Sequence, residues 1–136
     1  IFDVDRFTSF EGNTGPYILY TIVRIKSILN RYVEAGGNLE AGELLPASNG
    51  SEKNLMLQLS GFGSMIESAF EEKAPHKICA YIYEVSNAFN SFYHETKILS
   101  EENQAQKESY IRLLQLTRKV LETSIDLLGF EAPDKM

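Results

Sequence analysis

The sequence predicts an all-α protein, a bundle of about five helices in one domain over residues 1–136. Two apolar series advance in steps of four and three residues, and no convincing strand pattern interrupts them; the series are Ile18, Ile22, Ile25, Leu29, Tyr32 and Ile78, Ile82, Val85, Phe89, Phe92. This spacing places each series on one stripe of an α-helix. With 43% hydrophobic residues, the chain can bury a core of its own.

The first long helix is expected to begin near Pro16, with Asn13 or Thr14 as its N-cap. Gly36-Gly37 should end it, because glycine adopts the left-handed conformation that closes many helices. The polar stretch from residue 36 to residue 50 then predicts a loop.

A second helix is expected from Ser51, with Gly61 and Gly63 interrupting it and a short helix resuming around Ser64. Its apolar side is Leu55, Met56 and Leu59, and the short helix is expected to turn Met65, Ile66, Ala69 and Phe70 inward. Pro75 should open the helix that carries the second long stripe, because proline suits a first helical turn.

The last helix should follow Ser100 and end at Gly129. The residues we expect it to bury are Tyr110, Leu114, Leu121, Ile125 and Leu128. The chain starts at Ile1 with no initiator Met and no signal-peptide pattern, so we expect a domain excised from a larger, multidomain protein.

Several functional classes lack the residues they need. One cysteine, Cys79, cannot form an internal disulfide or a multi-cysteine zinc site, and it reads as a small apolar core residue. His76 and His94 lack a partner at metal-ligand spacing and read as surface residues. No apolar run approaches the roughly 18 residues that span a membrane. We expect no catalytic centre, no metal site and no cofactor in this chain.

The net charge of −6 argues at first against nucleic acid as a partner, because phosphate binding usually leaves a basic footprint. The charge is unevenly distributed, however. Residues 1–33 hold four bases and three acids, whereas residues 34–78 hold three and seven, and residues 79–136 hold six and nine. The first helix therefore lies in the only segment that is not acidic.

Tyr17, Tyr20 and Arg24 are spaced i, i+3 and i+7, so they share one face of the first helix. Two aromatic rings and a guanidinium in a row can stack on and hydrogen-bond unpaired bases. Alternatively, the tyrosines pack in the core and Arg24 pairs with an acid. Tyr93 falls beside the second stripe, which leaves its burial undecided, and Lys97 follows one turn later.

The sequence resembles the C-terminal, DALR-type anticodon-binding domain of arginyl-tRNA synthetases. Three segments in the same order carry the likeness: Phe10-Glu11-Gly12-Asn13-Thr14-Gly15-Pro16-Tyr17 with Tyr20 and Arg24-Ile25; Tyr81-Ile82-Tyr83-Glu84 with Phe89 and Phe92-Tyr93; and Leu127-Leu128-Gly129-Phe130-Glu131-Ala132-Pro133-Asp134-Lys135-Met136. Departures from the family pattern at Leu19, at Thr21-Ile22-Val23 and at Lys97 affect the details of base recognition.

The resemblance implies a domain that reads the anticodon loop of arginine tRNA and packs on the catalytic domain of its parent enzyme. It places anticodon contacts on Tyr17, Tyr20, Arg24, Tyr93 and Met136, with Lys97 as a possible contact to the RNA backbone. The ATP- and magnesium-dependent ligase chemistry would belong to the parent's catalytic domain, whose sequence motifs do not occur here. A cytoplasmic location, a monomeric fragment, and no membrane or DNA partner are also expected.

The alternative hypothesis is a helical scaffold for proteins, without RNA binding. It would dock partners on the apolar side of the second helix or on the loop of residues 36–50. The first helix discriminates between the two: in a scaffold, Tyr17, Tyr20 and Arg24 should be buried or salt-bridged rather than jointly exposed.

Overall fold

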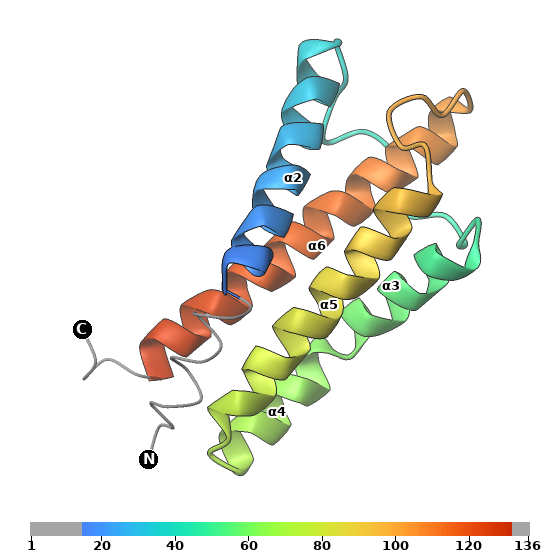
Figure 1. Cartoon of the computed structure of the whole chain (residues 1–136). Coiled ribbons are helices and arrows are strands. Elements are labelled where there is room, and N and C mark those ends of the chain that lie inside the picture. The colour runs from blue at the N-terminus through green and yellow to red at the C-terminus, as the bar shows by residue number, and fades with distance from the viewer. Residues whose placement is uncertain (1–14, 132–136) are drawn as a thin grey trace.

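The computed structural model describes residues 15–131, with side chains up to Leu128. They form five helices, α2 (Gly15–Glu34), α3 (Gly50–Ser60), α4 (Phe62–Glu71), α5 (Pro75–Glu95) and α6 (Gln104–Glu131), and no strand within that range (Figure 1). The all-α prediction is confirmed. None of the described helices combines the length and the apolar character needed to cross a membrane.

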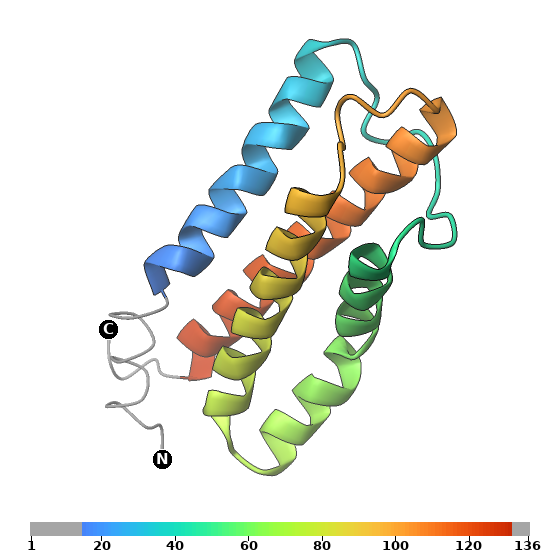
Figure 2. The same ribbon diagram turned by 45° about the vertical axis from the view of Figure 1, so that its right-hand side comes forward.

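Helix α5 occupies the centre of the bundle and contacts α2, α3, α4 and α6 (Figures 1 and 2). Helices α2 and α6 pack together on one side of it, and the nearly continuous pair α3 and α4 lies on the other. Both stripes predicted from the sequence are buried: every member of the α5 stripe is fully buried, and the α2 stripe is at most 6% exposed. The core therefore forms around α5.

Two glycines end α2 as predicted. Gly36 has φ +95°, in the left-handed region that favours glycine. A Cβ atom on Gly37 would collide with the ring of Tyr32, which is the last buried residue of the α2 stripe. The predicted N-caps of this helix, Asn13 and Thr14, lie outside the described residues.

The loop between α2 and α3 is held to α6 by side chains. Arg112 donates to the carbonyl oxygens of Glu40 and Gly42, and Gln115 donates to that of Leu39. Helix α3 then begins at Gly50, one residue before the predicted start. Its N-cap is Asn49, whose side-chain oxygen accepts a 2.8 Å hydrogen bond from the backbone N–H of Glu52.

Three expectations about helix ends and burial were wrong. Helix α4 resumes at Phe62 rather than near Ser64, because Gly61 alone separates it from α3. Phe70 is 44% exposed, since it lies about 100° around the helix from buried Ala69. Helix α6 continues through Gly129 to Glu131, because an interior glycine costs a helix only about 1 kcal/mol.

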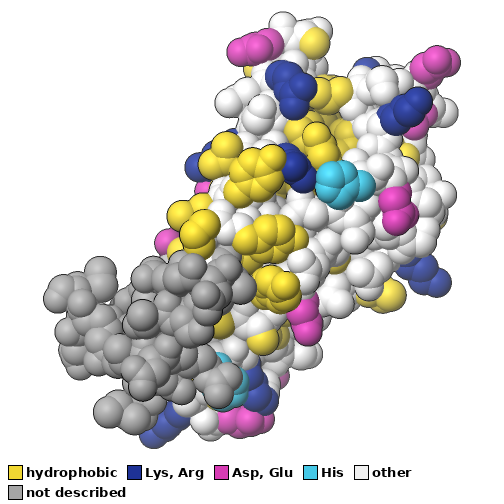
Figure 3. Space-filling view, in the orientation of Figure 1, with side chains coloured by type: hydrophobic (Ala, Val, Ile, Leu, Met, Phe, Trp, Pro, Cys, Tyr) yellow, Lys and Arg dark blue, Asp and Glu magenta, His cyan; other side chains and the backbone are white. Residues whose placement is uncertain are grey.

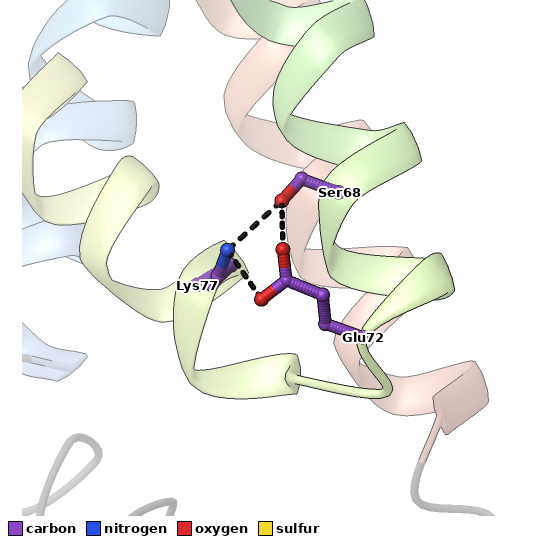
Figure 4. Close-up of polar contacts among 3 residues, drawn as sticks. All are labelled: Ser68, Glu72 and Lys77. Carbon is purple, nitrogen blue, oxygen red and sulfur yellow. Dashed lines mark hydrogen bonds and ion pairs between the residues drawn. The ribbon is translucent and has the colours of Figure 1, made fainter.

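The turn between α4 and α5 is fastened by the three side chains in Figure 4. The Lys77 ammonium lies 2.8 Å from a carboxylate oxygen of Glu72 and donates to the hydroxyl of Ser68, which in turn donates to Glu72. Pro75 is in the first turn of α5, as predicted. These contacts link the end of α4 to the first turn of α5.

The contacts among Ser68, Glu72 and Lys77, here called the Glu72 clamp, make the stability of the fold at acid pH depend on Lys77. The hydrogen bond from Lys77, followed by the one from Ser68, lowers the pKa of Glu72 below its ordinary 4.5. The clamp therefore stabilises the fold above the unfolded-state pKa, and this contribution is lost as pH falls through the folded-state pKa. In Lys77→Met the pKa of Glu72 should rise toward 4.5 in a titration of its carboxyl ¹³C signal. The same pKa in both proteins would contradict this account.

Candidate nucleic-acid interface

The first half of α2 and the second half of α5 together form a shallow surface depression of about 480 Å³. Its lining comes from both helices, with Tyr17, Tyr20 and Arg24 on α2 and Asn87, Asn90, Ser91 and His94 on α5. Figure 3 shows hydrophobic and aromatic side chains gathered on this face beside a basic side chain and a histidine. Tyr93 lies next to the depression through its contact with Arg24.

The Arg24 guanidinium packs against two tyrosine rings, one from each helix. Its central carbon lies 4.8 Å from the ring centroid of Tyr20 and 4.3 Å from that of Tyr93, both within cation–π range. One terminal nitrogen donates to the hydroxyl of Tyr20 and the other to the side-chain oxygen of Asn90, each at 2.8 Å. Arg24 is thus held in one orientation at the surface.

Tyr17 is half-buried, and its hydroxyl is bound on both sides by α5. The hydroxyl donates to the side-chain oxygen of Asn87 at 2.6 Å and accepts from the amide nitrogen of Asn90 at 3.0 Å. Its ring packs against that of Tyr83, with centroids 5.8 Å apart. Tyr17 therefore joins the two helices and also borders the depression.

Tyr93, undecided from the sequence, is half-buried. One turn after Phe89, it stacks on that fully buried ring at 6.3 Å and meets the His94 ring edge-on at 5.3 Å. The core thus supports Tyr93 from beneath, while Arg24 lies over its ring.

The placement of Tyr20 and Arg24 contradicts the alternative in which these residues are core or salt-bridged, whereas Tyr17 packs partly against the core, as that alternative has it. Tyr20 is 56% exposed, and Tyr17 and Arg24 are half-buried. Within residues 15–128, the hydrogen-bond partners of Arg24 are an amide and a phenol, and no acid pairs with it.

Two predicted contact residues are not placed at the depression. Helix α5 ends at Glu95 and Thr96 is extended, so exposed Lys97 lies beyond the helix instead of one turn along it. Met136 lies outside the described residues. Conversely, sequence reasoning overlooked Asn87, Asn90 and Ser91, although their i, i+3, i+4 spacing marks one face of α5.

The side chains that line the depression are of kinds that bind a ligand through stacking and hydrogen bonds. Across the described part of the chain, no group of His, Cys, Asp or Glu side chains has the arrangement to hold a metal ion. What the site offers is exposed aromatic surface, a fixed guanidinium, and amide, hydroxyl and imidazole groups from α5. Unpaired bases are recognised by stacking on aromatic rings and guanidinium planes and by hydrogen bonds to their edges.

Fold and site together define a helical bundle with a surface suited to single-stranded RNA bases. Comparison with known families assigns it more specifically: residues 18–136 match the DALR anticodon binding domain family. The chain belongs to this family.

Individual relatives agree with this assignment. Over its whole length the chain is 67% identical to an arginine–tRNA ligase of Agathobacter rectalis, 54% to one of Alkaliphilus oremlandii and 43% to one of Maricaulis maris. It spans 23% of the length of each of these curated relatives.

Removing single hydroxyls should reveal how firmly α2 and α5 are joined. Tyr17→Phe removes a hydroxyl that makes two hydrogen bonds across the helix pair, so we expect the free energy of unfolding to fall by about 1 kcal/mol. Tyr20→Phe is the matched control, because that hydroxyl bonds only to Arg24 on its own helix, within the described contacts. Urea unfolding measures both variants, and equal losses would contradict the bridging role of Tyr17.

Proposed function

We propose that this chain is the domain with which an arginine–tRNA ligase holds the anticodon loop of its tRNA. Family membership and the likeness to arginine–tRNA ligases support the proposal. The observation that carries it is the Arg24 guanidinium fixed between Tyr20 and Tyr93 on an open face, because unpaired bases are recognised by aromatic rings and guanidinium planes of this kind.

Anticodon bases would be held by stacking. Tyr20 is more than half exposed, so its ring can receive an unpaired base without any rearrangement of the core. Tyr17 is half-buried and lines the depression beside Tyr20, while half-buried Tyr93 lies beneath Arg24. Stacking a base on an aromatic side chain is worth about 1–3 kcal/mol, so a few bases suffice for a measurable affinity.

The domain should recognise the middle base of the anticodon most strictly, because that base is the same in every arginine tRNA. Arginine codons are CGN, AGA and AGG, so that base is cytosine in every arginine tRNA. A guanidinium carries five N–H donors, and two of those on Arg24 bond to Asn90 and Tyr20. The others can donate to the ring nitrogen and carbonyl oxygen of a cytosine, which are both acceptors.

The acidic charge of the chain is compatible with this role. Base stacking does not need a basic surface, whereas phosphate binding does. Lys97 would contribute one contact to the RNA backbone, and Met136 an apolar wall beside the bases. The other domains of the ligase would hold most of the tRNA backbone, so the isolated chain should bind RNA weakly.

The same proposal extends to the rest of the protein. This chain would be a single domain of a multidomain cytoplasmic enzyme, and it would pack on a catalytic domain that binds ATP and magnesium and joins arginine to its tRNA. It would itself be monomeric, with no part in catalysis and no membrane or DNA partner.

A protein-docking scaffold finds less support. Its proposed surface on α3 is directed inward, because Leu55 is fully buried, Leu59 is 6% exposed and Met56 is half-buried against the core. That side of the helix completes the bundle and is not available to a partner.

Truncating the exposed tyrosine tests the stacking role. Tyr20→Ala should weaken binding of an arginine anticodon stem-loop by about tenfold or more, the loss expected for one stacked base. Leu57→Ala is the matched control, because Leu57 is 59% exposed on α3, across α5 from α2 (Figure 2). Fluorescence titration measures both affinities. If Tyr20→Ala binds as tightly as the unmodified chain, the stacking role is wrong.

A conservative change at Arg24 tests how the middle base is read. The unmodified chain should prefer cytosine over uracil at that position by about tenfold, which is typical of a good pair of hydrogen bonds. Arg24→Lys keeps the charge but loses the planar fork of donors, so the preference should fall to about twofold. Titration with the two stem-loops gives both ratios, and an unchanged preference would exclude Arg24 as the reader.

A further inference from the structure

Asn90 is the residue on which the polar contacts between α2 and α5 converge. Its side-chain oxygen accepts from Arg24 at 2.8 Å, and its amide nitrogen donates to the hydroxyls of Tyr17 and Thr21, each at 3.0 Å. One half-buried amide on α5 thus contacts three α2 side chains, two of which line the depression.

The direction of the Arg24–Asn90 hydrogen bond determines how the Asn90 amide is turned. Arg24 can only donate, so it must face the oxygen of Asn90, and the amide N–H groups must face the two hydroxyls. Each hydroxyl accepts from Asn90 and donates onward, Tyr17 to the Asn87 side chain and Thr21 to the backbone carbonyl of Tyr17. Both amide hydrogens of Asn90 therefore have an acceptor on α2.

Asparagine fits this position better than aspartate or leucine, the two residues closest to it in shape. Aspartate offers the acceptor that Arg24 needs but has no N–H for the two hydroxyls, and leucine has the shape but neither function. Thr21, one of the partners, is fully buried in the α2–α5 contact, which limits how far the amide can move.

We propose that Asn90 is a positioning residue, one that holds the Arg24 guanidinium in its binding orientation before RNA arrives. This inference rests on the proposed function, in which Arg24 contacts the anticodon. An arginine side chain that is already ordered loses less conformational freedom when it binds. Asn90 acts through Arg24 and does not itself need to touch a base.

The first test uses the 136-residue chain without RNA. The rate of rotation about the Nε–Cζ bond of Arg24 can be measured by ¹⁵N NMR. This rotation should be slow in the unmodified chain. It should be about tenfold faster in Asn90→Leu, because that variant lacks a hydrogen bond to a charged group. Asn87→Leu is the matched control one turn earlier on α5, since Asn87 bonds to Tyr17 and not to Arg24. It should leave the rotation of Arg24 slow.

Free rotation of Arg24 in the unmodified chain, or equal rates in the unmodified chain and Asn90→Leu, would overturn the inference. Should Asn90→Leu fail to fold, Asn90→Asp replaces it. The carboxylate keeps an acceptor facing Arg24, so the rotation should stay slow, and fast rotation in this variant would also overturn the inference.

The second test uses an arginine anticodon stem-loop as the probe. Asn90→Leu should weaken binding about tenfold in the unmodified background and less than twofold in an Arg24→Ala background, because its effect passes through Arg24. Equal losses in both backgrounds would overturn the positioning role. If Arg24→Ala alone leaves RNA binding unchanged, the proposed contact between Arg24 and the anticodon is wrong, while the rotation measurement still decides whether Asn90 positions Arg24.

Discussion

The structure depends on α5 packing with two different faces at once. One face carries Ile78, Ile82, Val85, Phe89 and Phe92, all fully buried, and around it the other four described helices assemble. The adjoining face is polar and meets the start of α2 through Asn87 and Asn90. Because core packing fixes the rotation of α5, it also fixes where these amides lie relative to α2. The core thereby sets the geometry of the surface.

This coupling makes the proposed RNA contact compatible with an acidic domain. Tyr93 rests on the buried Phe89 ring, Arg24 lies over Tyr93, and Asn90 fixes the direction of the guanidinium. The proposed recognition surface is one layer of side chains on a close-packed core, and stacking on it does not require a positive net charge. An electrostatic surface would instead need several basic side chains in open solvent, and its affinity would fall steeply with salt.

The helical pattern in the sequence predicts the fold well, because burial repeats every three to four residues and both long stripes are buried as expected. It also places Tyr17, Tyr20 and Arg24 on one face. Predictions failed where one residue decided the outcome: α6 continues past Gly129, and extended Thr96 separates Lys97 from α5. Asn90 was missed because its importance lies in partners 66 to 73 positions away, which periodicity within one helix cannot reveal.

We propose that the anticodon bases contact the described bundle on its α2–α5 face. The most direct measurement is an NMR titration of the chain with an arginine anticodon stem-loop, following backbone amides together with tyrosine ring and arginine Nε signals. The shifts should concentrate at five residues of this face: Tyr17, Tyr20, Arg24, Asn90 and Tyr93. Shifts centred on the outer faces of α3 or α6, with these five residues unchanged, would contradict it.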